Sequence, residues 1–138
     1  MTIRSYRDLQ VWQLAMRLAH LAYDCTNLFP PIERYVLLPQ VRRAALSVPA
    51  NIAEGRGREH TGDFLNFIST SRGSVQELET YLLFANQRSY LTDAQIQGPM
   101  ELADHVSRKL WRLRETLTAH PRRAARGSML ARGTRRDE

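Results

Sequence analysis

The hydrophobic positions of this chain recur at spacings of three and four residues in four separate segments, which is the period of an amphipathic α-helix. We expect helices over residues 8–28, 38–57, 61–88 and 92–120. No stretch shows the alternation of period two that is typical of strands. Four amphipathic helices with short connections predict an all-α fold, an antiparallel up-down four-helix bundle.

The first segment has two adjacent apolar stripes. They comprise Val11, Leu14, Leu18, Leu21, Cys25 and Leu28, and beside them Trp12, Ala15, Ala19, Ala22 and Phe29. One seam of a bundle needs a narrower apolar face than this. We therefore interpret the second stripe as support for contacts beyond a single bundle, such as those of an oligomer.

The second segment carries a proline at its centre and two glycines near its end. Pro49 costs roughly 3 kcal/mol inside a helix, which predicts that this helix is held by packing on more than one side. Gly55 and Gly57 are predicted to stop the helix. Arg56 and Arg58 then lie at the negative end of the helix dipole.

The two later helices each contain residues that usually interrupt a helix. Residues 69–74 have the composition of a turn, but the hydrophobic stripe passes through them in phase, so we expect a continuous helix there. Gly98 and Pro99 predict either a kink in the fourth helix or a start at Pro99. Thr92 and Gln95 have the spacing of a capping box.

Three stretches of the chain together resemble a known protein family. They are YRDLQVWQLAMRLA at residues 6–19, NLFPPIERYVLLPQVRRAALSVPANIAEGRGR at 27–58 and DFLNFISTSRGSVQELETYL at 63–82. They are similar to a four-helix-bundle family first noticed as open reading frames inside intervening sequences of bacterial 23S ribosomal RNA genes, and the resemblance covers about residues 3–118.

The resemblance implies a small helical bundle that assembles into rings of five. It also implies a relation to the basic accessory protein of diversity-generating retroelements, which works with a reverse transcriptase and RNA. No catalytic residues are attached to the family, so the resemblance implies none for this chain.

The composition is that of one globular domain, with 43% hydrophobic and 25% charged residues in a chain of 138. We expect a bundle domain over residues 1–120 and a disordered, basic tail over 121–138. The single cysteine, Cys25, excludes an internal disulfide and fits a reducing compartment. No signal peptide or membrane span is evident, so we expect a cytoplasmic protein without membrane contact.

The formal net charge of +6 favours an anionic partner. After Pro121 six arginines stand against two acidic residues, so +4 of this charge lies in the tail and +2 in the body. Lys109 is the only lysine among the 20 basic residues. Arginine suits bidentate phosphate contacts. A genomic bias toward GC-rich codons predicts the same excess, and both explanations stay open.

The candidate nucleic-acid contacts of the body are five arginines, namely Arg42, Arg43, Arg56, Arg58 and Arg72. For each of them the alternative is a solvated side chain with ion pairs. Ser47, Asn51 and Glu54 lie near the small-residue face of the second helix. We interpret these three as a structural polar network across a helix or subunit interface, because no nucleophile or base accompanies them.

We predict no metal and no other cofactor, since Glu101, Asp104 and His105 lack the second copy that a di-metal bundle needs. Arg114 and His120 have the spacing of a helical-bundle ribonuclease pair, but His120 adjoins a proline at a helix end. We therefore predict a non-enzymatic protein that acts as an RNA-binding or scaffold accessory protein, and the resemblance implies that it is a homopentamer. A pure protein-interaction scaffold and a ribonuclease remain the alternatives.

Overall fold

The computed structural model describes residues 3–119, which form four long helices. Their bounds are α1 Gln10–Thr26, α2 Leu37–Arg56, α3 Thr61–Gln87 and α4 Asp93–Ala119. Short 3-10 helices precede the first two, η1 at Tyr6–Asp8 and η2 at Pro31–Glu33. No strand occurs in residues 3–119, so the all-α prediction is confirmed. The predicted tail, 121–138, lies outside the described residues.

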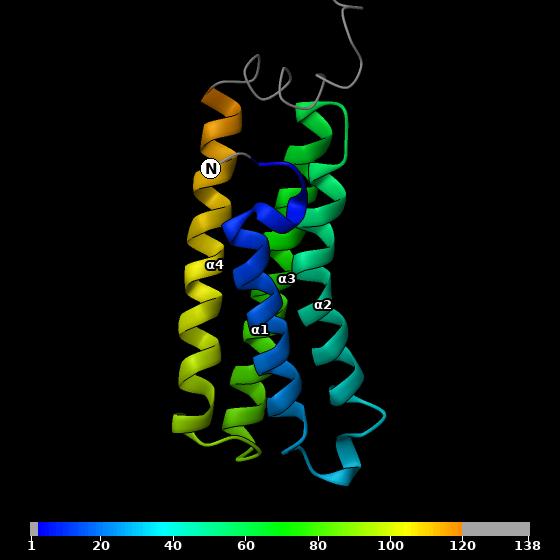
Figure 1. The fold of residues 1–138 in the computed structure, drawn as a ribbon. Helices are drawn as coiled ribbons and strands as arrows, with labels where there is room; N and C mark the ends of the chain where they lie inside the picture. Colours follow the sequence, from blue (N-terminus) through cyan, green and yellow to red (C-terminus); the bar gives the residue numbers. More distant parts are fainter. Residues whose placement is uncertain (1–2, 120–138) are drawn as a thin grey trace, which may run out of the picture.

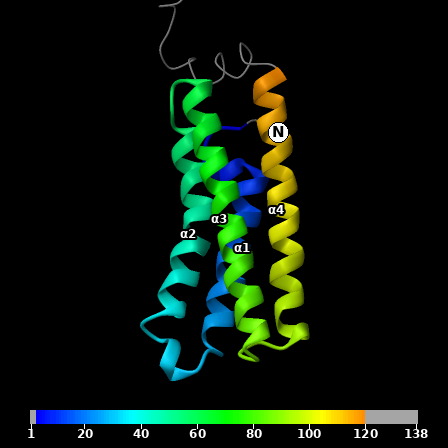
Figure 2. The ribbon, with the colours of Figure 1, turned by 180° about the vertical axis from the view of Figure 1, so that it is seen from behind.

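The helices lie side by side as a bundle in which consecutive helices run antiparallel (Figures 1 and 2). α2 packs on α1 and α3, and α4 closes the bundle against the same two helices. The α1–α2 and α3–α4 connections therefore lie at one end of the bundle, and the α2–α3 connection lies at the other (Figure 1).

The core is built from the stripes that the sequence predicts. All four helices contribute fully buried aliphatic side chains, among them Leu18, Val48, Ile52, Ile68, Leu78, Leu82, Val106 and Leu110. Burying one such side chain contributes about 1.5–3 kcal/mol before the loss of chain entropy is subtracted. The predicted helix ends lie within two residues of the observed ones, and the largest differences are in α1, because Asp8 belongs to η1 and the chain leaves α1 after Thr26.

The three alanines of the second apolar stripe are buried inside this single bundle, and Trp12 and Phe29 are partly buried. Ala15 and Ala22 have no exposed surface and Ala19 is 4% exposed, because α1 packs on both α2 and α4. Small side chains on this stripe let the neighbouring helices approach α1 closely. The stripe therefore gives no support for an oligomer, which corrects the interpretation made from its width.

α2 and α3 approach each other closely at Gly55. A Cβ at this position would lie 2.6 Å from the Cβ of Phe67 and 2.9 Å from Cδ1 of Phe64. Gly55 is thus a packing residue inside α2, and the prediction that it stops the helix is wrong. Gly57 is the residue that follows the helix, with an ordinary φ of −80°. Pro49 is buried within a continuous α2 that packs on two sides, as predicted.

α3 runs without a break through residues 69–74, as predicted. α4 also runs without a break through Pro99, so the helix does not start there, and the predicted kink stays a prediction. Pro99 lies close to the beginning of α4 and is buried, so the lost backbone bond is offset by packing. The capping box is confirmed: the N–H of Gln95 donates to Thr92 Oγ1 at 3.1 Å, and the N–H of Thr92 donates to Gln95 Oε1 at 2.9 Å.

Candidate nucleic-acid interface

Arg42 is held against the end of α1. Its Nε donates to Oγ1 of Thr26 at 3.0 Å, and its guanidinium lies 4.6 Å from the ring centroid of Tyr23. A further, longer bond runs to Oδ1 of Asn27 at 3.4 Å. Most of the fork of Arg42 is therefore occupied in joining α1 to α2.

Arg43 points to the other side of α2, where it pairs with Glu77 of α3. The Tyr81 hydroxyl also donates to this carboxylate, at 2.8 Å. Burial raises the pKa of Glu77, but the bonds from Tyr81 and Arg43 outweigh it and lower the pKa overall. Glu77 in turn raises the pKa of Arg43. Arg42 and Arg43 thus face different helices, as the 100° step along a helix requires.

Arg56 and Arg58 lie at the end of the bundle where α2 meets α3. The guanidinium of Arg58 lies 4.8 Å from the ring centroid of Phe67 and 3.7 Å from the carboxylate of Glu54. The side chain of Arg56 is half-buried and forms no hydrogen bond or ion pair with any described residue. This end carries two cations but one of them is already partly neutralised.

Two residues of the predicted polar network are brought together between α2 and α3. The hydroxyls of Ser47 and Ser74 are 2.7 Å apart, and Nδ2 of Asn51 donates to Oγ and to the carbonyl oxygen of Ser47 at 2.9 and 2.7 Å. One turn back along α3, the buried Ser71 hydroxyl donates to the carbonyl of Val48, the residue after Ser47, at 2.9 Å. Glu54 takes no part and pairs with an arginine of its own helix end instead. The network joins helices within one chain.

Arg72 lies on the opposite side of α3, against Trp111 of α4. Its guanidinium carbon is 4.7 Å from the indole centroid, and that of Arg114 is 4.9 Å from the same ring. Among the described residues, Nε of Arg72 is the only buried side-chain nitrogen or oxygen without a hydrogen-bond partner. Of the five predicted arginines, Arg72 is therefore the one that has a buried donor without an acceptor.

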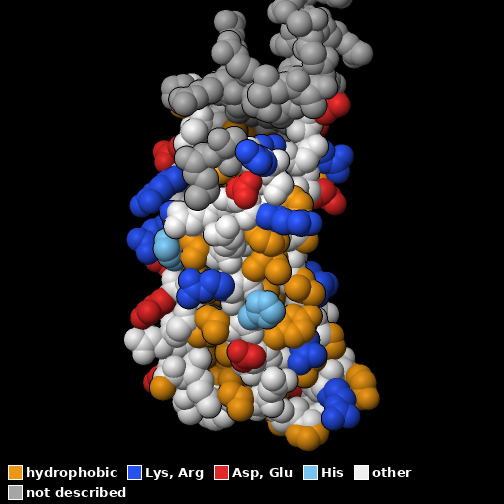
Figure 3. All heavy atoms as spheres, viewed as in Figure 1, with side chains coloured by type: hydrophobic (Ala, Val, Ile, Leu, Met, Phe, Trp, Pro, Cys, Tyr) orange, Lys and Arg blue, Asp and Glu red, His pale blue; other side chains and the backbone are white. Residues whose placement is uncertain are grey.

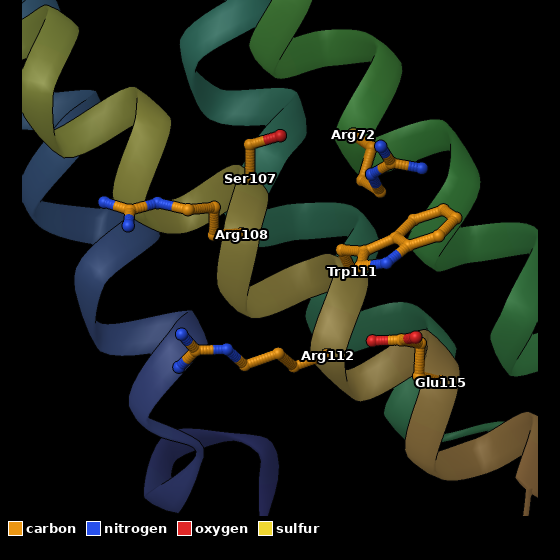
Figure 4. A pocket seen from close by; sticks show the side chains of 6 residues that line it. All are labelled: Arg72, Ser107, Arg108, Trp111, Arg112 and Glu115. Atoms are coloured by element: carbon orange, nitrogen blue, oxygen red, sulfur yellow. The ribbon is translucent and has the colours of Figure 1, made fainter.

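A shallow pocket of about 320 Å³ opens beside Trp111. It is lined by Arg72 of α3 and by Ser107, Arg108, Trp111, Arg112 and Glu115 of α4. In Figure 4 the side chains of Arg72 and Trp111 face each other, whereas Arg108 and Arg112 extend to the other side of α4. Arg108 pairs with Asp104 at 3.0 Å, and Arg112 has no ion pair within residues 3–119. We call Arg72, Arg108, Arg112 and Arg114 the α3–α4 arginine patch.

Sequence reasoning found Arg72 of this patch but missed its partners on α4. Arg108, Arg112 and Trp111 are exposed by the i, i+4 geometry of a helix whose buried stripe runs through Leu110 and Leu117. That buried stripe was visible in the sequence. The residues between its positions form the exposed face of the helix, and they could have been used to predict these arginines and the tryptophan as surface residues. Arg114, considered as one member of a ribonuclease pair, lies over Trp111, and His120 lies outside the described residues.

A second surface feature is apolar. Figure 3 shows hydrophobic side chains at the lower right, over the connection between α1 and α2, with a cationic side chain among them. Ile32, Tyr35 and Val36 in this connection are 78%, 84% and 65% exposed. We call these three residues the apolar tip. Exposed side chains of this size in one short segment are typical of an interaction surface.

Nowhere in residues 3–119 do three His, Cys, Asp or Glu side chains come together in a way that would hold a metal ion. Every helix of the described part is too short or too polar to cross a membrane.

The fold and its surface define the class of this protein, a small all-α bundle with arginines clustered on an outer helix pair. A family model described as 23S rRNA-intervening sequence protein matches residues 7–112, more than half of the chain. The chain belongs to this family, as the resemblance of its three sequence stretches indicated. A search of curated proteins gave no match.

Proposed function

We propose that this protein is a non-enzymatic helical bundle that binds RNA through the phosphates, using the α3–α4 arginine patch. The observation that carries the proposal is that Arg72 of α3 and Arg114 of α4 lie over one exposed tryptophan, while Arg108 and Arg112 line the adjoining pocket. One of them, Arg108, is paired with an acid, while Arg72 and Arg112 have no ion pair within the described residues. The name of the family, which refers to 23S ribosomal RNA, supports an RNA-related role.

The chemistry of the patch suits a polyanion better than a single small ligand. Three arginines and Glu115 line a pocket that is open to solvent, so the local charge is positive and the groups remain hydrated. Guanidinium groups bind phosphate oxygens through two parallel N–H bonds. Release of counterions from the nucleic acid then drives binding, with a dependence on log salt of about 0.7 per contact for a single strand and about 0.9 for duplex DNA.

The test compares two double variants of the full chain with the same loss of charge. Arg72→Ala with Arg112→Ala removes half of the patch. Arg34→Ala with Arg88→Ala removes two exposed arginines in the connections at the far end of the bundle. Circular dichroism first verifies that both variants are folded. Fluorescence anisotropy with a labelled structured RNA then measures affinity across a salt series.

We expect the patch variant to bind at least about tenfold more weakly and to lose between one and two units of salt slope, while the end variant keeps most of its affinity. Equal losses in both variants would mean that only overall charge matters, and the patch would have no special role. If the unaltered chain binds no RNA at low salt, the proposal is wrong.

Assembly into a ring of five is a second part of the proposal, and the apolar tip supports it. Ile32, Tyr35 and Val36 are more exposed than a monomer of this size usually leaves such residues. Light scattering measures the particle mass directly. We expect Ile32→Ser with Tyr35→Ser to reduce the mass to that of one chain, and Leu46→Ser, at an exposed position on α2, to leave it unchanged. A monomeric unaltered chain would contradict the ring.

The apolar tip also favours a second candidate function, a scaffold for another protein. The two functions give different results in the same two assays. If the protein is a scaffold, the unaltered chain binds a partner protein and the tip variant does not. In the anisotropy assay neither the unaltered chain nor the patch variant then binds RNA. The ribonuclease alternative is checked on the same samples, because labelled RNA would shorten during incubation and His120→Ala would stop the cleavage.

A further inference from the structure

Trp111 is held in an unusual setting for a large aromatic side chain. The residue is 42% exposed although it lies two turns before the end of α4, and its ring is approached by two guanidinium groups. Cation–π contacts stabilise this arrangement without covering the ring as a core would. An indole that is kept at the surface by cations is available to a planar group that displaces one of them.

Of the two guanidinium groups on the indole, that of Arg72 is the one that a new hydrogen-bond acceptor would draw away from the ring. Over Trp111 the guanidinium makes a cation–π contact, but its Nε–H is buried there without a hydrogen-bond acceptor. A buried donor without a partner costs free energy that a new acceptor would recover. The pair Nε and Nη of an arginine forms the fork that binds two oxygens of one phosphate. Rotation of Arg72 off the indole would complete this fork.

Trp111 and Arg72 lie on one side of α4, and Arg108 and Arg112 extend to the other (Figure 4). A chain that crosses α4 would therefore meet arginines before and after the indole. A nucleic-acid strand has this pattern, because phosphates alternate with planar bases along it. Bases stack on exposed aromatic rings in many single-strand binding proteins.

We propose that Trp111 and Arg72 form a site for one nucleotide unit of single-stranded RNA, with the base stacked on the indole and Arg72 turned outward to the phosphate. Arg112 binds the neighbouring phosphate, and the Ser107 hydroxyl lies on the same side of α4 as the indole. This inference rests on the proposed function and adds which form of RNA is preferred. A duplex covers its base faces, so it contacts the arginines but not the indole.

The test uses Trp111 as its own reporter. The chain has two tryptophans, and Trp12 packs edge-on against Tyr6 with centroids 5.2 Å apart, so Trp12→Phe retains a ring there and leaves Trp111 as the only tryptophan. The Trp12→Phe protein is titrated with single-stranded oligoadenylate, with a duplex RNA of the same length and with tripolyphosphate. Tryptophan emission reports stacking, and anisotropy of labelled RNA reports binding in parallel.

We expect oligoadenylate to quench Trp111 in a saturable way at the concentrations where anisotropy rises. The duplex should bind without quenching, and tripolyphosphate should leave the emission nearly unchanged. Trp111→Leu should reduce the affinity for oligoadenylate by about tenfold and leave the affinity for the duplex unchanged. Arg72→Lys keeps the charge but lacks the fork, so it should also weaken the binding of oligoadenylate.

The outcomes separate this inference from the proposed function. Binding of both RNAs with unchanged Trp111 emission, or equal affinity of the Trp111→Leu protein, would overturn the stacked site and leave the proposed function standing. Quenching by tripolyphosphate as strong as that by oligoadenylate would mean an anion site without a base, which also overturns it. Absence of binding to either RNA would overturn both proposals. A phosphopeptide that quenches Trp111 where oligoadenylate does not would assign the site to a protein partner instead.

Discussion

Gly55 makes the approach of α2 to α3 testable through a single methyl group. In Gly55→Ala the new Cβ is fixed to the backbone and cannot rotate away from Phe67 Cβ, which would lie at 2.6 Å. The Phe64 ring can move, but Phe67 Cβ cannot, so the helices must separate. Overpacking of this kind costs about 1–3 kcal/mol. The higher helix propensity of alanine returns about 1 kcal/mol. We expect a net destabilisation of up to about 2 kcal/mol.

Gly73 provides the matched control, because it lies in the middle of α3 with no atom within 4 Å of an added Cβ. Gly73→Ala should therefore stabilise the protein by about 0.5–1 kcal/mol through helix propensity alone. Denaturant unfolding followed by circular dichroism measures both variants against the unaltered chain. The prediction is one of opposite signs. If Gly55→Ala is as stable as Gly73→Ala, α2 and α3 are not in close contact and the interpretation of Gly55 fails.

Three further predictions concern single groups. Ser89 has a left-handed φ of 64°, so Ser89→Gly should raise the unfolding free energy by about 1 kcal/mol, and a destabilised variant in the same unfolding assay would contradict this. The pKa of Glu77 is lowered on folding, so its stabilising contribution is present above the unfolded pKa near 4.3 and is lost as pH falls through the lower folded value. Glu77→Gln should therefore flatten the acid limb of a stability–pH curve, and an unchanged limb would refute it. Burial raises the pKa of the Cys25 thiol, which is 5% exposed, so a thiol reagent should react fully only after denaturation, and fast labelling of the native protein would be inconsistent with this.

The helices could be predicted from the sequence because each depends on local information. The stripe of α3 through Ile68, Val75 and Leu82 stayed in phase across residues 69–74, and periodicity proved a better guide than turn composition there. For Pro99 the sequence left two possibilities open, a kink in the helix or a helix start. A proline near the start of a helix loses one backbone bond at a place where packing can compensate, and the sequence does not show that packing.

The candidate site could be predicted only in part from the sequence, because the capacity of an arginine to bind a phosphate depends on which groups become its neighbours in the fold. The helical period shows that Arg42 and Arg43 point in different directions, but it does not show that one is bound to the end of α1 and the other to Glu77 of α3. Arg72 looked like any other surface arginine. Its contact with Trp111, 39 positions further along the chain, and its unsatisfied Nε exist only because α3 and α4 pack side by side.

The sequence by itself determined the number, type and approximate ends of the helices, their buried faces and the family. These follow from the helical period and from residues close together in the chain, so no knowledge of distant contacts is needed. The tertiary structure alone decided that Gly55 is a packing residue, that the second stripe of α1 is used within one bundle and that Arg72 meets Trp111. Each of these depends on the rotation and spacing of two packed helices, which are set by the fit of many side chains at once.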